Sequence, residues 1–241
     1  MTQNEFIKEC KGLFACNGLS CTEEQAEALH RLTERMLTVN QTMNLTAIKE
    51  EKAVILRHYV DSLTISSWIP GGAKVIDVGC GAGFPTLPLA IFRPDLIITA
   101  LDGTAKRIAY VQETANMLEL SNVTAVAGRA EEFAQNDAYR ERFDVVTARA
   151  VAALPVLCEL CIPFARVGGM MIAMKSAQAK EEIAQAKHCI EVCGGAIEKE
   201  ASCDLTDGEN TEKRTLILVS KKKLTPKIYP RHFSKISKKP L

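Results

Sequence analysis

The first 70 residues repeat apolar positions at the spacing of amphipathic helices. In one segment the apolar side chains are Phe6, Ile7, Cys10, Leu13 and Phe14, and in the next they are Leu29, Leu32, Met36 and Val39. Each set falls on one helical face, so the pattern predicts two helices with a buried side. Thr22-Glu23-Glu24-Gln25 fits a capping box that opens the second helix. A third helix is expected over 50–67, and Pro70-Gly71-Gly72 ends the section.

From residue 74 onwards, short apolar runs alternate with longer amphipathic segments. Strands are predicted over 74–78, 97–101, 123–127, 143–147 and 170–174, with helices between them that include 87–92 and 105–118. This alternation is typical of an α/β fold, a mostly parallel sheet with helices on both faces. Two further strands, 196–202 and 214–219, follow each other without a helix, which predicts an antiparallel pair at the sheet edge.

The pattern divides the chain into an N-terminal helical extension over 1–70, an α/β domain over 71–220 and a C-terminal tail over 221–241. With 241 residues, of which 47% are hydrophobic, the chain is long enough for a full core. No apolar run approaches the roughly 20 residues of a membrane-spanning helix. The first residues lack the basic start and apolar run of a secretion signal, so we expect a cytoplasmic protein.

The nine cysteines are irregularly spaced and odd in number, which argues against a disulfide scaffold. Cys158 and Cys161 have the spacing of half a zinc site. They lie on the same helical stripe as Leu154 and Leu157, however, and no second pair with matching histidines follows. We therefore expect two core cysteines and no metal.

Charge is divided unevenly along the chain. The last 21 residues carry eight Lys or Arg and no acid, whereas the preceding 220 carry 22 bases and 29 acids. A mildly acidic body with a basic tail indicates contact with a polyanion, against the alternative of a solvated terminus. The candidate RNA contacts are Lys221, Lys222, Lys223, Lys227 and Arg231.

The stretch Asp77-Val78-Gly79-Cys80-Gly81-Ala82-Gly83 follows the first predicted strand and lets the backbone turn sharply beside a ligand. Asp102 ends the second strand, where a carboxylate can accept hydrogen bonds from both hydroxyls of a ribose. The dinucleotide fingerprint fails because Phe84 stands at its last glycine. The pattern Asp-x-Gly-x-Gly-x-Gly instead resembles the cofactor loop of class I S-adenosylmethionine-dependent methyltransferases.

Further stretches make the resemblance more specific. In chain order they are Asn44-Leu45-Thr46-Ala47-Ile48, His58-Tyr59-Val60-Asp61-Ser62-Leu63, Gly83-Phe84-Pro85, Lys106-Arg107, Gly128-Arg129-Ala130-Glu131, Arg149-Ala150-Val151, Met174-Lys175 and Tyr229-Pro230-Arg231. Over nearly the whole chain they resemble the bacterial small-subunit ribosomal RNA methyltransferase G family, also called glucose-inhibited division protein B. Thr86 and Ser176 stand where this family usually has glycine, and Thr86 leaves open how closely the turn approaches the cofactor.

The resemblance implies a Rossmann-like class I methyltransferase that transfers a methyl group from S-adenosylmethionine to N7 of a guanine in the decoding region of 16S ribosomal RNA. It implies that the cofactor is bound by Gly79, Gly81, Gly83, Phe84, Asp102, Gly103, Thr104, Ala130, Glu131 and Arg149. Residues 102–104 would surround the ribose, and Ala130 and Glu131 would flank the adenine. The expected partner is 16S ribosomal RNA or the small ribosomal subunit, and the expected state is a monomer.

Guanine N7 offers a lone pair and carries no proton, so attack needs no general base, and we assign no catalytic acid or base. Arg149 would hold the cofactor carboxylate, bond guanine O6, or pair with Glu131 or another acid. His58 and Asp61 are three residues apart on one predicted helix and can face the same way. The alternatives are a methyltransferase for another RNA or a small molecule, a nucleotide-dependent RNA-binding protein without turnover, and an NAD-dependent oxidoreductase.

Overall fold

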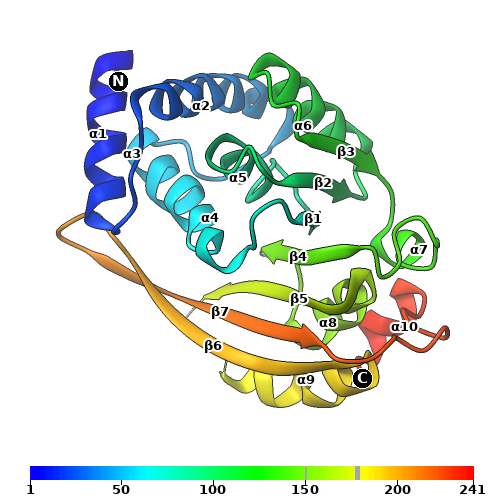
Figure 1. The fold of residues 1–241 in the computed structure, drawn as a ribbon. Helices are drawn as coiled ribbons and strands as arrows, with labels where there is room; N and C mark the ends of the chain where they lie inside the picture. Colours follow the sequence, from blue (N-terminus) through cyan, green and yellow to red (C-terminus); the bar gives the residue numbers. More distant parts are fainter. Residues whose placement is uncertain (150, 177–179) are drawn as a thin grey trace.

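The computed structural model describes residues 1–149, 151–176 and 180–241. Ala150, part of one stretch that carries the family resemblance, lies outside the described residues. The chain opens with two helices, α1 (Gln3–Cys16) and α2 (Glu23–Met43) (Figure 1). Each begins with a capping box, Thr2 with Glu5 and Thr22 with Gln25, so the predicted box is confirmed.

The third predicted helix is present but is not regular. It consists of α3 (Glu51–Val54), a π-helical stretch (Ile55–Val60) and α4 (Asp61–Leu63), followed by a 3₁₀ turn (Ser66–Trp68). Periodicity alone does not distinguish π-helical from α-helical turns, because both keep one face buried. The π-helical stretch contains His58, and such stretches are frequent at functional sites.

Seven strands of the described residues form one sheet in the order β3-β2-β1-β4-β5-β7-β6. Their bounds are β1 (Lys74–Val78), β2 (Ile97–Asp102), β3 (Val123–Ala127), β4 (Phe143–Arg149), β5 (Ala165–Ser176), β6 (Gly195–Thr206) and β7 (Thr211–Lys221). Neighbours from β3 to β5 are parallel, and β7 is antiparallel to both β5 and β6. The predicted α/β fold class with its antiparallel edge is confirmed. The chain order reverses between β1 and β4, where ligands of open α/β sheets bind.

Helices cover both faces of the sheet. The remaining ones are α5 (Thr86–Phe92), α6 (Ala105–Met117), α7 (Ala130–Phe133), α8 (Leu154–Cys161), α9 (Lys180–Val192) and α10 (Phe233–Lys238). Figure 1 shows α1, α2 and α6 on one side and α8, α9 and α10 on the other. The two sides have separate cores, and β1 contributes Val75 to the first and Ile76 to the second. Cys158 and Cys161 are fully buried in the second core, as predicted.

The predicted C-terminal tail is docked on the domain. Strand β7 continues through Lys221, so the first tail residue belongs to the sheet. The Arg140 guanidinium donates hydrogen bonds of 2.7–3.2 Å to the carbonyl oxygens of Thr225, Pro226 and Tyr229. Ile236 of α10 is fully buried in the second core. The tail therefore lies against α8 and the segment that joins α7 to β4, and Figure 1 shows α10 beside α7 and α8.

Candidate functional site

The glycine-rich loop begins where β1 ends. Gly79, Gly81 and Gly83 have φ angles of 75°, 56° and 88°, in the left-handed region that side chains disfavour. The amide N–H groups of Gly79 and Cys80 both donate to the Leu101 carbonyl, which ties the loop to β2. A Cβ on Gly79 would lie 2.7 Å from a Val151 methyl, so a side chain here would have to displace Val151.

Asp102, the last residue of β2, is 7% exposed. One carboxylate oxygen accepts a 3.0 Å hydrogen bond from the Gly81 amide and the other a 2.8 Å bond from the Thr104 amide. A carboxylate oxygen has two lone pairs, so each oxygen can accept one more hydrogen bond. The backbone thus orients a carboxylate that suits the two adjacent hydroxyls of a ribose.

Two cavities meet at Asp102. The β2 cavity, of about 290 Å³, is lined by Val78, Gly79, Leu101, Asp102, Gly103, Thr104, Gly128, Arg129, Ala130, Glu131, Val151, Ala152, Leu160 and Phe233. The glycine-loop cavity, of about 340 Å³, is lined by Leu45, Thr46, His58, Gly79, Cys80, Gly81, Ala82, Phe84, Asp102, Arg107, Arg149 and Val151. Both include Gly79, Asp102 and Val151, so together they form an elongated site with the carboxylate near its middle.

A third cavity, of about 300 Å³, adjoins the glycine-loop cavity and shares His58 and Arg149 with it. This Arg149 cavity is lined by Ile48, Arg57, His58, Asp61, Arg149, Met174, Lys175, Ser176, Arg214 and Leu216. Four of its residues are Lys or Arg. It lies beyond the carboxyl ends of β4 and β5.

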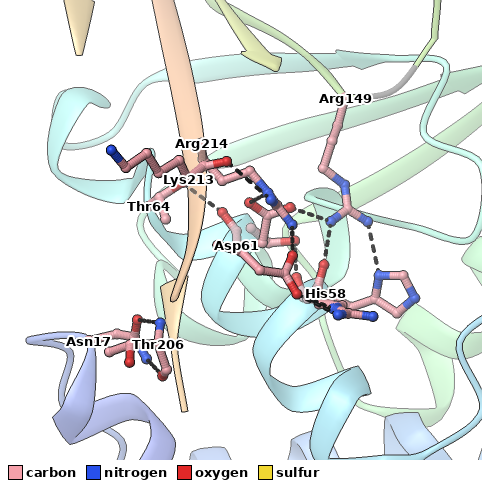
Figure 2. Close-up of polar contacts among 11 residues, drawn as sticks. Asn17, His58, Asp61, Thr64, Arg149, Thr206, Lys213 and Arg214 are labelled. Atoms are coloured by element: carbon pink, nitrogen blue, oxygen red, sulfur yellow. Dashed lines mark hydrogen bonds and ion pairs between the residues drawn. The ribbon is translucent and has the colours of Figure 1, made fainter. Parts of the chain in front are cut away.

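Arg149 is the hub of a polar network between these cavities (Figure 2). Its Nη1 donates to the Arg57 carbonyl at 3.0 Å and to the Asp61 carboxylate at 2.9 Å, and its Nη2 donates to His58 Nδ1 at 3.2 Å. Asp61 also pairs with Arg214 of β7 at 3.3 Å. The structural partner of Arg149 is therefore Asp61 rather than Glu131, which pairs with Arg129.

His58 is held neutral in this network. A guanidinium only donates, so Nδ1 must be the acceptor and the ring proton lies on Nε2, which donates to the Thr46 hydroxyl at 2.9 Å. The ring stacks on Phe84, with centroids 4.4 Å apart. Burial and the adjacent Arg149 charge lower the pKa of His58 to about 3. His58 and Asp61 do face the same way, since both contact Arg149.

Asp77 supports the glycine loop from beneath. Its buried carboxylate accepts hydrogen bonds from the hydroxyls of Thr86 on α5, at 2.7 Å, and Thr147 on β4, at 3.1 Å. Burial raises the pKa of Asp77 to about 6, although both hydroxyls oppose the shift. Thr86 stands at a position where the sequence departs from the family pattern described above. It is fully buried, and its hydroxyl points to Asp77 rather than into a cavity.

Nine of the ten residues predicted to bind the cofactor line the β2 or the glycine-loop cavity. The exception is Gly83, which lines neither of them. A Cβ there would lie 2.6 Å from Leu87, so Gly83 serves the close packing of the loop on α5.

Two of the five predicted RNA contacts form ion pairs with acids of the domain. Lys221 is 2% exposed and its ammonium pairs with Glu141 at 3.2 Å, so it cannot reach a phosphate. Arg231 makes a two-pronged ion pair with the fully buried Glu159, at 2.8 and 2.6 Å. Both cations hold the tail on the domain. Arg231 stays partly exposed, and the side chains of Lys222, Lys223 and Lys227 are exposed. For these four residues the RNA contact stays a prediction.

Several lining residues are absent from the predicted set. Thr46, His58, Arg107 and Arg129 belong to stretches that carry the family resemblance, so a signal for them was present. Phe233 is different, because nothing in its sequence surroundings connects it to the glycine loop. It reaches the β2 cavity only because the tail folds back over α8.

The fold and the site define a class I methyltransferase. An O-methyltransferase from Bacillus cereus, solved in complex with S-adenosylhomocysteine, has a similar fold, with a TM-score of 0.52 at 17% identity over 78% of this chain and 90% of that one. The family model for rRNA small subunit methyltransferase G matches residues 25–210. Ribosomal RNA small subunit methyltransferase G of Leuconostoc citreum is 42% identical over 93% of this chain and 94% of its own. That of Lactobacillus johnsonii is 42% identical over the full length of both. The chain belongs to the rRNA small subunit methyltransferase G family.

Membership confirms the predicted family, enzyme class and cofactor, S-adenosylmethionine. It therefore excludes the oxidoreductase alternative. No helix in the described part of the chain is long and apolar enough to cross a membrane. Within residues 1–149, 151–176 and 180–241, no group of three or more His, Cys, Asp or Glu side chains is arranged to hold a metal ion.

Proposed function

We propose that this chain transfers a methyl group from S-adenosylmethionine to N7 of a guanine in the decoding region of 16S ribosomal RNA. The observation that carries the proposal is the elongated site centred on Asp102, with the cationic Arg149 cavity at one end. Bound there, S-adenosylmethionine supplies an electrophilic methyl group on a sulfonium. The rest of the chemistry depends on how the chain positions the two reactants.

The residues present fit this cofactor. Asp102, oriented by two backbone amides, would accept the ribose hydroxyls at the junction of the two cavities. The adenine would lie in the β2 cavity beside Ala130 and the buried Glu131 carboxylate, an acceptor for the exocyclic amine. The methionyl part would lie in the glycine-loop cavity, against Gly81 and Phe84. Gly79 allows the close approach of ligand and backbone that a side chain would block.

The target guanine would enter through the Arg149 cavity. Among the described residues, the partners of Arg149 take both Nη1 protons and one Nη2 proton, which leaves its Nε–H and second Nη2–H for a ligand. These donors suit a guanine O6 or a cofactor carboxylate. The neutral His58 fixes the guanidinium without adding charge. Since N7 has no proton to remove, the site needs no base.

We propose that RNA phosphates contact the exposed lysines of the docked tail. Lys222, Lys223 and Lys227 lie on the segment that Arg140 holds against the domain. Because the tail is docked, its deletion is not a test of RNA binding alone. Deleting 221–241 would remove Lys221 from the sheet and Phe233 from the β2 cavity, so it would disturb the fold and the cofactor site together.

The main experiment supplies labelled S-adenosylmethionine and unmodified small ribosomal subunits, followed by nucleoside mass spectrometry. The expected product is 7-methylguanosine. Asp102→Ala should abolish labelling, whereas Asp137→Asn, a change at an exposed acid outside the three cavities, should leave it unchanged. Label in another nucleoside would refute the target atom, and no label on subunits or on deproteinised RNA would refute the substrate.

The RNA interface is tested by replacing Lys222, Lys223 and Lys227 with Ala. Each lost phosphate contact should reduce the slope of log K against log salt by about 0.7–0.9. The control triple, Lys8, Lys74 and Lys187 to Ala, has the same charge change at other exposed positions and should keep the wild-type slope. Equal slopes in both triples would refute the interface. A monomer acting in the cytoplasm is part of this proposal, and light scattering of the purified chain tests the monomer.

A further inference from the structure

Phe233 brings the C-terminal segment into the wall of the β2 cavity. It is the first residue of α10, and it lines the cavity together with Ala130 and Glu131 of α7. The ring is partly buried and packs against the second core. An aromatic ring in the wall of a cavity that already offers a carboxylate has the chemistry of a nucleobase subsite, with an apolar surface for the base faces and a polar group for the base edge.

The Phe233 ring and the Glu131 carboxylate both contact Arg129. The Arg129 guanidinium lies over the Phe233 ring, 5.0 Å from its centroid, and its Nε lies 3.4 Å from Glu131. Arg129 thereby contacts both Phe233 and Glu131, two residues of the cavity wall. An aromatic ring held in place loses little freedom when it packs against a base, which favours binding.

The segment that carries Phe233 is anchored on both sides. Before it, the Arg231 guanidinium and backbone amide both bond the buried Glu159 carboxylate. After it, Ile236 is fully buried. Glu159 is followed on α8 by Leu160, which itself lines the cavity, so one helix supplies both the anchor and a second apolar wall.

We infer that Phe233 packs against the adenine of the cofactor, and that Arg231, through Glu159, is the positioning residue for it. The C-terminal segment is thus part of the cofactor site as well as a carrier of lysines. This inference rests on the proposed placement of the adenine in the β2 cavity.

Calorimetric titration of the full chain with S-adenosylhomocysteine and with 5′-deoxy-5′-methylthioadenosine tests it without turnover. Phe233→Ala should weaken both ligands by roughly tenfold, because stacking on an aromatic side chain is a sizeable part of base affinity. Phe233→Tyr should restore binding. Ile228→Ala, at an exposed apolar residue of the same segment that does not line the cavity, should match wild type.

The positioning role of Arg231 predicts non-additive effects. Arg231→Gln should weaken both ligands, and Arg231→Gln combined with Phe233→Ala should bind no more weakly than Phe233→Ala alone. Full additivity would overturn the positioning role.

A second measurement applies if Phe233→Ala does not fold. The indole fluorescence of Phe233→Trp should change when methylthioadenosine is added, whereas in wild type Trp68 lines neither cofactor cavity and should not respond. Wild-type protein that binds neither ligand would overturn the cofactor site and this inference together. Wild-type binding with no loss in Phe233→Ala, or a silent Phe233→Trp, would overturn this inference alone.

Discussion

His58 makes the stability of the fold fall in mild acid. An unfolded histidine has a pKa near 6.5, but burial and Arg149 lower the pKa of His58 to about 3 in the folded chain. Between these two pKa values the unfolded chain binds a proton at His58 that the folded chain does not bind. The free energy of unfolding therefore falls as pH drops below 6.5. From pH 7 to pH 5 this linkage corresponds to about 2 kcal/mol.

His58→Gln is the matched perturbation, because the amide oxygen can accept from Arg149 and the amide nitrogen can donate to Thr46. Urea unfolding of both proteins at pH 5, 6 and 7 measures the effect. Asp77 acts in the opposite direction over this range: its pKa of about 6 is raised above the unfolded 3.8, so it adds about 1 kcal/mol of stability between pH 7 and pH 5. That contribution is common to both proteins and cancels in their difference.

The expected result is a stability difference that moves by about 2 kcal/mol in favour of His58→Gln between pH 7 and pH 5. Parallel pH dependences of wild type and variant would refute the neutral, buried His58 that the network requires.

Five further variants, at four positions, test the loop and the network. Gly83→Asn should lower the free energy of unfolding, measured in urea, by more than about 2 kcal/mol, because its Cβ would lie 2.6 Å from Leu87. Gly81→Asn, whose Cβ would have no neighbour nearer than 3.9 Å, should lower it by less than about 1 kcal/mol. Thr86→Gly should cost about 1–3 kcal/mol through the lost hydrogen bond to Asp77, and Thr86→Ser, which keeps the hydroxyl, should recover most of it; equal losses would contradict this reading. Arg149→Ala should reduce methyl transfer more than stability, because Asp61 keeps its pair with Arg214; equal reductions would leave Arg149 only a structural role.

The fold and the glycine-rich loop could be predicted because local sequence patterns indicate both of them. Alternation of apolar strands with helical segments predicts the sheet, and glycines after β1 with an acid at the end of β2 predict a site for a ribose. The glycine loop and Asp102 come from strands that are neighbours in the sheet, so their proximity follows from the parallel order alone. Cys158 and Cys161 were predictable for the same reason, since their helical stripe is apolar throughout.

Features that depend on distant pairing were not predictable. Arg149 and Asp61 are brought together by the packing of the π-helical stretch on the end of β4, and either residue could have paired elsewhere. Phe233 lines the β2 cavity on a segment that the Arg231–Glu159 ion pair joins to α8. No periodicity encodes such a pairing, because each partner lies in a segment whose own pattern is satisfied without the other.

In the tail, the count of charged residues predicts the positive sign of the surface charge but not which cations are exposed. Of its eight cations, Lys221 and Arg231 are taken up by Glu141 and Glu159, which are acids of the body. The six other side chains are exposed, so the tail keeps most of its positive charge while the two pairs fix its position. A tail that did not dock would be a flexible chain, and its ordering on RNA would cost conformational entropy. In a docked tail that entropy is lost on folding rather than on RNA binding, so the exposed lysines are already ordered when RNA binds.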